Sequence, residues 1–303
     1  MVTRVLSKQG LLILENRNYA LLQAAILALL PFTAWLSVAV VMLVTLRKGA
    51  QEGAVVLLAA MMSQLAVELV SMATTTALIN TLLTFLPSFL VAYTLRLTIS
   101  WQAVSIVFLG QILTIFLIIH IVSPDFIIQQ YLSIRDALKE MHPETAFFKL
   151  VDHQVAGKEE LLANYMLGIQ GVALVITSLL PLMLARALQS SLFYPGGLRS
   201  ELLQFRSNWL GLTLLLISFC SACKENLIAV NLLPAMLFYF LLTGLSLSCS
   251  VLKNKKKFYS CLLLLTPLII MPLVAVPIYV IIGCLDSLFN FRMYLTLDVD
   301  KKI

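Results

Sequence analysis

The sequence predicts an all-α fold: a polytopic helical membrane protein with about 8-10 membrane segments, in which an N-terminal helical bundle precedes further C-terminal helices. Of its 303 residues 60% are hydrophobic and only 12% are charged, whereas soluble domains carry roughly 25% charged residues. The mean hydropathy is +0.97. Cations lie in short clusters between the apolar runs, so positive-inside topology explains the formal charge of +6, and we expect no nucleic-acid binding.

The first apolar region, Ala20–Leu46, is interrupted by Pro31. It fits either one kinked crossing or a hairpin of two short helices. A hairpin keeps the cations on both flanks on the cytoplasmic side, so the positive-inside rule favours the hairpin. The residues before Ala20 are too polar for a signal peptide, and we expect a retained, cytoplasmic N-terminus.

Three further spans are predicted at Gly53–Met72, Thr76–Leu95 and Trp101–Val122. The last of them opens into residues 123–160, where seven acidic side chains outnumber four basic ones. Part of this segment, FIIQQYLSIRDALKEM, has the periodicity of an amphipathic helix. Its acidic balance indicates a loop on the external side of the membrane.

A polar bridge, residues 193–209, separates the two apolar halves. The helix Leu162–Leu192 leads into it, and Pro181 predicts a kink in that helix. Pro195 and the two glycines after it must end the helix, and the arginines and aromatic rings around the turn are typical of a cytoplasmic membrane boundary. The predicted organisation is an N-terminal bundle of residues 1–192, the cytoplasmic bridge 193–209 and C-terminal helices 210–303, within one continuous membrane domain.

Two spans, Leu210–Cys223 and Leu227–Leu247, follow the bridge and end at a basic run, Lys253–Lys257, which anchors the cytoplasmic side. The last apolar region, Phe258–Phe291, contains three prolines and is too long for one relaxed span. We interpret it as a proline-broken hairpin. A single kinked helix with an external C-terminus is the alternative.

Four stretches of this sequence carry a resemblance to a known family: LRKGAQEG at 46–53, ARALQ at 185–189, YPGGLRSELLQFR at 194–206 and GCLDSLFNFR at 283–292. With them the chain resembles the YybS-like family of uncharacterised bacterial inner-membrane proteins. That family is distantly similar to the S components of energy-coupling-factor transporters, which bind vitamins. The resemblance implies an S-component-like N-terminal bundle in the bacterial cytoplasmic (inner) membrane.

Polar side chains within the N-terminal spans form the candidate solute site. The candidate solute-binding residues are Gln64, Glu68, Asn80 and Gln170. Glu68 is the most informative, because an ionisable group in a span is costly and usually faces protein or a water-filled cavity. Helical spacing places these groups in the outer half of three helices, where they can converge on one pocket. Alternatively, the amides only join helices by hydrogen bonds.

Ala20, Ala24 and Ala28 recur every four residues and line one helix face. Small residues let a neighbouring backbone approach closely, so this face is a candidate helix-docking stripe. S components use a similar face to meet a transmembrane coupling subunit. Packing within the chain is an equally good explanation of the stripe.

No catalytic, metal or cofactor motif is evident in this sequence. Cys220 and Cys223 form a CxxC inside an apolar helix pattern, without the further ligands of a zinc site. His120 lies near a predicted helix end and also lacks a paired ligand. We therefore expect a protein that is not an enzyme and that holds no metal ion or cofactor.

Two function classes remain open. The first is an S-component-like subunit that binds a small solute or vitamin and relies on a coupling subunit and ATPase for energy, because the chain has no nucleotide-binding loop. The second is a non-transporting scaffold or assembly partner for another inner-membrane protein. In the scaffold, the bridge and LDSLFNFR, residues 285–292, would be docking surfaces.

Overall fold

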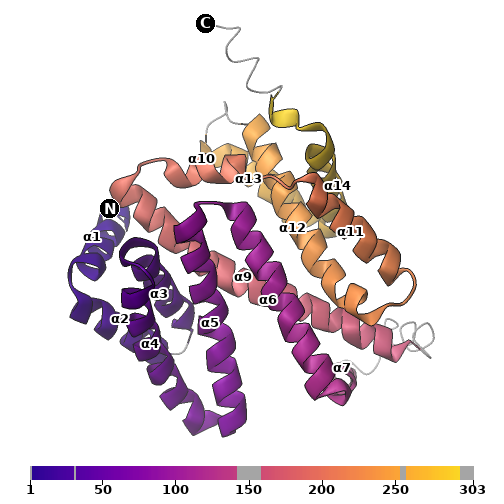
Figure 1. Ribbon diagram of the computed structural model, residues 1–303, viewed down its shortest axis with the longest axis horizontal. Helices are drawn as coiled ribbons and strands as arrows, with labels where there is room; N and C mark the ends of the chain where they lie inside the picture. The colour runs from indigo at the N-terminus through magenta and orange to yellow at the C-terminus, as the bar shows by residue number, and fades with distance from the viewer. Residues whose placement is uncertain (1, 31, 142–157, 253–256, 294–303) are drawn as a thin grey trace, which may run out of the picture. The chain divides into compact units, whose positions relative to one another are not determined.

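The computed structural model describes residues 2–30, 32–141, 158–252 and 257–293, and these residues form a succession of helices joined by short connections (Figure 1). In the first half of the chain the helices are α1 Val2–Glu15, α2 Arg17–Leu29, α3 Ala34–Lys48, α4 Ala50–Ser71, α5 Thr74–Thr98, α6 Trp101–Val122 and α7 Pro124–Met141. In the second half they are α9 Glu159–Phe193, α10 Gly197–Gln204, α11 Trp209–Ala222, α12 Leu227–Val251, α13 Lys257–Ile270 and α14 Pro272–Phe289.

Six helices in the described part of the chain, α4, α5, α6, α9, α12 and α14, are long and apolar enough to cross a membrane. The number rises to seven if α10 and α11 together make one broken span. The all-α, polytopic membrane fold is therefore confirmed. The expected 8-10 segments also included the shorter apolar helices α2, α3 and α13, which have 13, 15 and 14 residues and are too short to cross a core of about 30 Å alone.

The chain divides into two compact units, each assembled from two segments. Unit 1 consists of Met1–Phe108 with Ala173–Phe205, and unit 2 consists of Leu109–Val172 with Arg206–Ile303. Helices α6 and α9 are each divided between the two units, α6 after Phe108 and α9 after Val172. The 35 residues of α9 extend about 52 Å at 1.5 Å per residue, far more than one span needs. In this division residues 109–172 of the predicted N-terminal bundle group with the C-terminal helices.

The first apolar region of unit 1 forms two helices that fold back on each other. The Ser37 hydroxyl on α3 donates a 2.7 Å hydrogen bond to the Ala24 carbonyl on α2. In one continuous helix these residues would lie about 20 Å apart. The hairpin favoured by the flanking charges is thus the arrangement that the chain adopts.

Helix α3 is the buried centre of unit 1. Every residue from Ser37 to Leu46 is buried, as expected for a helix that is apolar on all sides. Gly49, with φ of +113°, allows α4 to begin directly after α3 ends. At Gly53 the two helices are so close that a methyl group would collide with the Thr45 hydroxyl.

The bridge contains the turn that its proline and glycines predict. Helix α9 ends at Phe193, Gly196 adopts a φ of +89°, and α10 begins at Gly197. An ion pair between Arg186 on α9 and Glu201 on α10, with side chains 16% and 17% exposed, fixes α10 against its neighbour. The Glu201 carboxylate also accepts a 3.1 Å hydrogen bond from the indole of Trp101.

The last apolar region of unit 2 is a hairpin, as we interpreted it. Helices α13 and α14 are separated at Met271. The Tyr279 hydroxyl donates a 2.9 Å hydrogen bond to the Leu264 carbonyl, and both side chains belong to one apolar cluster. Residues 15 positions apart in a single helix lie about 22 Å from each other and cannot make this contact.

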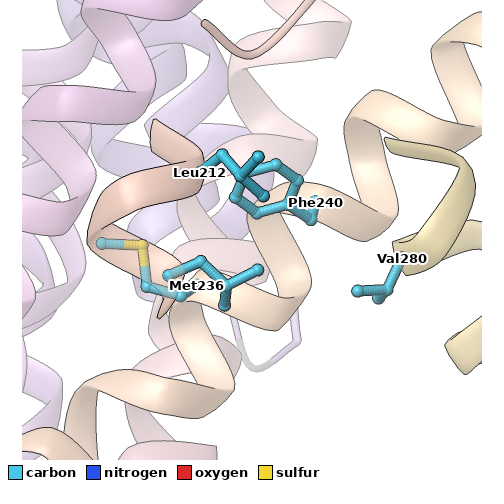
Figure 2. Close-up of a cluster of buried hydrophobic side chains, with 5 residues drawn as sticks. Leu212, Met236, Phe240 and Val280 are labelled. Atoms are coloured by element: carbon cyan, nitrogen blue, oxygen red, sulfur yellow. The ribbon is translucent and has the colours of Figure 1, made fainter. Parts of the chain in front are cut away.

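The core of unit 2 lies where α11, α12 and α14 meet. Figure 2 shows Leu212 of α11 against Phe240 of α12, with Met236 one turn away on the same helix and Val280 of α14. Two glycines allow the backbones of α12 and α14 to approach directly. A methyl group at Gly244 would collide with the Tyr279 carbonyl oxygen, and one at Gly283 would collide with the Phe240 carbonyl oxygen.

Candidate functional site

The most unusual side chain in the spans of unit 1 is the carboxylate of Glu68. It lies in the last turn of α4, three residues before the helix ends at Ser71, or about 5 Å along the axis. Its side chain is only 8% exposed. Glu68 is closer to the helix end than the sequence alone suggested.

Three neighbouring side chains donate hydrogen bonds to this carboxylate. The amide of Gln64 donates to Glu68 Oε1 over 2.8 Å, and the amide of Asn80 donates to the same oxygen over 2.6 Å. The hydroxyl of Thr81 donates to Oε2 over 3.1 Å. Gln64, Glu68, Asn80 and Thr81 are called the Glu68 cluster below.

Local structure explains why these four residues meet. Gln64 and Glu68 are four residues apart and therefore share one face of α4. The chain reverses within two residues, Met72 and Ala73, so the first two turns of α5 lie beside the last two turns of α4 (Figure 1). Asn80 and Thr81 belong to those turns.

Three members of the cluster are buried and one is exposed. Gln64, Glu68 and Thr81 are buried, whereas Asn80 is exposed. The Gln64 carbonyl oxygen, Oε1, is buried and has no hydrogen-bond partner within the residues described. A buried acceptor without a partner costs free energy, so this oxygen is a place where a bound molecule would be stabilised.

The carboxylate has no cationic partner in the described part of the chain. The ion pairs found there join other residues, and the three groups that bond to Glu68 are neutral. Ionisable side chains in membrane spans usually pair with one another or mark the path of a substrate or ion. Glu68 is therefore the candidate functional residue with the strongest physical argument.

The structure brings together three of the four predicted solute-binding residues. Gln64, Glu68 and Asn80 lie in one cluster, while Gln170 is a half-buried residue of α9 that belongs to unit 2. Sequence reasoning missed Thr81. The signal was its position directly after Asn80, because a tight turn places both residues beside the end of α4.

The predicted docking stripe on α2 is covered by the chain itself. Ala20, Ala24 and Ala28 are 1%, 0% and 5% exposed, because α2 packs this face against α3 and α4. The larger apolar residues on the other side of α2, such as Leu22, are exposed. In this structure the alanines therefore pack helices within the protein, and their face is not available to a partner.

A second polar network lies in unit 2 and includes His120. Its Nε2 atom lies 3.1 Å from the Asn164 side-chain oxygen, and its Nδ1 atom lies 2.9 Å from the Phe116 carbonyl oxygen. Asn231 donates a 3.1 Å hydrogen bond to the same Asn164 oxygen. These amides join α6, α9 and α12, which is the helix-joining role that the sequence offered as the alternative for buried amides.

The last of the four family-like stretches forms a charged cluster at the end of α14. Arg292 Nε lies 3.0 Å from the fully buried carboxylate of Asp286, and its Nη2 atom donates to Ser246. Arg206 donates to the carbonyl oxygens of Asp286 and Ser287 over 3.0 and 3.1 Å. Burial lowers the pKa of Arg292, while the neighbouring carboxylate acts in the opposite direction. The cluster caps the helix and joins α12, α14 and the segment before α11.

A shallow cleft of about 260 Å³ lies between the starts of α9 and α12 in unit 2. Its lining includes Lys158, Glu160 and Glu225. Lys158 and Glu225 are exposed and lie 3.6 Å apart. Exposed charges of this kind are screened by water and salt, so we assign no binding role to the cleft.

No family model matches the chain, and neither the curated proteins nor the solved structures contain a match to it. The fold and the site therefore define a class: a polytopic helical membrane protein with a buried carboxylate cluster at one end of an antiparallel helix pair.

Proposed function

We propose that the protein is a solute-binding membrane subunit and that the Glu68 cluster is its binding site. The observation that carries this proposal is the Glu68 carboxylate, which is buried in a span, bonded only to neutral groups and next to the unpaired oxygen of Gln64. A few fixed hydrogen-bonding groups within an apolar span are the polar part of a usual small-molecule site.

The geometry supports binding from the end of the α4–α5 pair. Asn80 is exposed beside the turn, so a solute that displaces or joins its amide gains access to the carboxylate behind it. Glu68 lies within about 5 Å of the end of α4, so the solute need not cross the bilayer to reach it. The external side is the proposed side of access.

An S-component-like role is the particular form of this proposal. Its support is the resemblance of the four quoted stretches and the absence of a nucleotide-binding loop from the sequence. A coupling subunit and an ATPase of the bacterial inner membrane would then supply the energy. Because the alanine face of α2 is buried, such a coupling subunit must contact another surface of unit 1.

The alternative proposal is a scaffold without a solute. Its expected docking surfaces were the bridge and residues 285–292. Key polar groups of both segments are engaged within the chain, Glu201 with Arg186 and Asp286 with Arg292. These intrachain contacts leave fewer groups for a partner and favour the solute-binding proposal.

The test is to identify small molecules that copurify with the protein. Wild-type protein in lipid nanodiscs is denatured, and the released molecules are quantified by mass spectrometry beside Glu68→Gln. The control is Ser178→Ala, which removes a buried 3.0 Å hydrogen bond to Ser88 elsewhere in unit 1. We expect one solute at near-equal stoichiometry in wild type and control, and at least about tenfold less in Glu68→Gln, equivalent to about 1.4 kcal/mol. A solute-free wild-type protein with a stable protein partner would support the scaffold instead.

A further inference from the structure

We infer that the Glu68 cluster binds a singly charged cationic group, either a sodium ion or the ammonium group of a solute. This inference rests on the proposed function and adds the chemical class of the ligand. It begins from charge: one buried carboxylate faces three neutral donors, and no described cation balances it. A cationic ligand would balance the charge that the chain leaves unpaired.

The free acceptor atoms fit such a ligand. A carboxylate has about four acceptor positions, and the three donors occupy three of them, two on Oε1 and one on Oε2. The Gln64 carbonyl oxygen adds a second free acceptor. Because the amide nitrogen of Gln64 bonds to Glu68, its oxygen lies within about 5 Å of Glu68 Oε1. The remaining free position of the carboxylate is on Oε2, and a cation that binds the cluster would use that position together with the Gln64 oxygen.

The direction of the Gln64 amide is fixed by its bond. Turning the amide over would bring its oxygen against the carboxylate oxygen of Glu68, and two acceptors would then repel each other. The nitrogen must therefore face Glu68, and the oxygen remains available. The C-terminal end of α4 adds the partial negative charge of the helix dipole at the same place.

Other ligand classes fit the cluster less well. An anion would be repelled by the carboxylate. Calcium sites use six to eight oxygen ligands and usually several carboxylates, whereas this cluster has one carboxylate. Among the described residues, no three His, Cys, Asp or Glu side chains are grouped as the ligands of a multivalent metal ion. A single positive charge matches the single negative charge of Glu68.

The experiment measures thermal unfolding in nanodiscs of zwitterionic lipid, so that lipid charge does not contribute. Sodium chloride, or methylammonium chloride in a parallel series, replaces tetraethylammonium chloride, a bulky cation without N–H donors, at constant ionic strength. We expect one of the two cations to raise the unfolding midpoint of wild type and of Ser178→Ala by about 5 °C at saturation. Glu68→Gln should show no shift with either cation.

The outcomes separate the ligand sources. A shift with sodium alone assigns the site to the inorganic ion, and a shift with methylammonium assigns it to a solute's ammonium group. No saturable shift in wild type, or an equal shift in Glu68→Gln, overturns the inference.

The outcomes also separate this inference from the proposed function. If an uncharged or anionic solute is recovered from wild type and lost from Glu68→Gln, and neither cation has an effect, the cationic class is wrong and solute binding stands. If sodium stabilises only proteins that retain Glu68 while no solute is recovered, the cation site stands and the solute-binding function is wrong.

Discussion

The side-chain amide of Asn80 lies 2.6 Å from the Glu68 carboxylate, across the two-residue turn that joins α4 and α5. This bond connects an exposed residue to a buried one. It therefore holds the ends of the two helices together, and under the proposed function it is also the point at which a solute would reach the carboxylate. Replacements at Glu68 separate these two roles.

Glu68→Ala should destabilise the protein by about 1–3 kcal/mol, because it leaves the Gln64 and Thr81 donors unpaired in a buried place. The free energy of unfolding of Glu68→Gln should stay close to that of wild type in the absence of ligand. The side-chain oxygen of the new glutamine accepts the hydrogen bonds from Gln64 and Asn80, and its NH2 group donates to the Thr81 hydroxyl. Every group of the cluster therefore keeps a partner. Unfolding of the ligand-free protein in detergent measures both effects. If Glu68→Gln is as unstable as Glu68→Ala, the negative charge is a structural requirement and the site loses its best residue.

Ala24→Leu should destabilise unit 1 by about 1–3 kcal/mol, because a larger side chain must be forced between α2 and the helices that cover it. The matched control is Ala66→Leu, the same change at an exposed position of α4, which should have little effect. Thermal unfolding in nanodiscs compares the two variants. If Ala24→Leu has normal stability but loses a copurifying protein, the alanine face is a docking surface for a partner after all.

Gly283→Ala should lower the free energy of unfolding by more than about 2 kcal/mol. The added methyl group collides with the Phe240 carbonyl oxygen, so it can be accommodated only if α12 and α14 move apart. Gly110→Ala is the control in a span, because open space surrounds that position. It should be neutral or stabilising by up to about 1 kcal/mol through helix propensity. Equal stability of the two variants would contradict the close approach of α12 and α14.

Glu201→Gln should loosen α10, because it removes the ion pair with Arg186 while keeping the size of the side chain. The measurement is the rate of tryptic cleavage after the exposed Arg199 on the same helix. We expect that rate to rise about tenfold, corresponding to about 1.4 kcal/mol of local stability. Gln204→Ala, at an exposed position of α10, should leave the rate unchanged. An unchanged rate in Glu201→Gln would mean that apolar contacts alone hold the helix.

The proposed orientation predicts opposite labelling of the two sides of the membrane. Single cysteines at Glu144, which lies outside the described residues, and at Ser200 on α10 are placed in a cysteine-free protein in intact cells. An impermeant maleimide should label the first and spare the second, because the acidic loop is expected outside and the arginine-rich bridge inside. Labelling of both positions to the same extent would exclude this topology.

Much of the fold follows from short-range rules in the sequence. The turn at Pro195–Gly197 and the hairpins at Ala20–Leu46 and Phe258–Phe291 were predictable, because proline, glycine and span length act locally. The two units were not predictable, because the division of the long helix α9 depends on which helices pack against each of its halves.

The candidate site shows the same limit. The cost of a carboxylate in a span identified Glu68, and helical spacing added Gln64. Thr81 was missed because its role depends on how α5 is rotated and shifted against α4. Gln170 has the same residue type as Gln64, and only packing places it in the other unit.

The measurement that tests the central claim most directly is an experimental density map of the wild-type protein in lipid nanodiscs, determined beside a map of Glu68→Gln. Solute binding predicts non-protein density within hydrogen-bonding distance of both Glu68 and the Gln64 carbonyl oxygen in wild type, and its absence in the variant. If the wild-type map instead shows both side chains in contact with protein atoms alone, the Glu68 cluster is a structural tie between α4 and α5, and the protein does not bind a solute there.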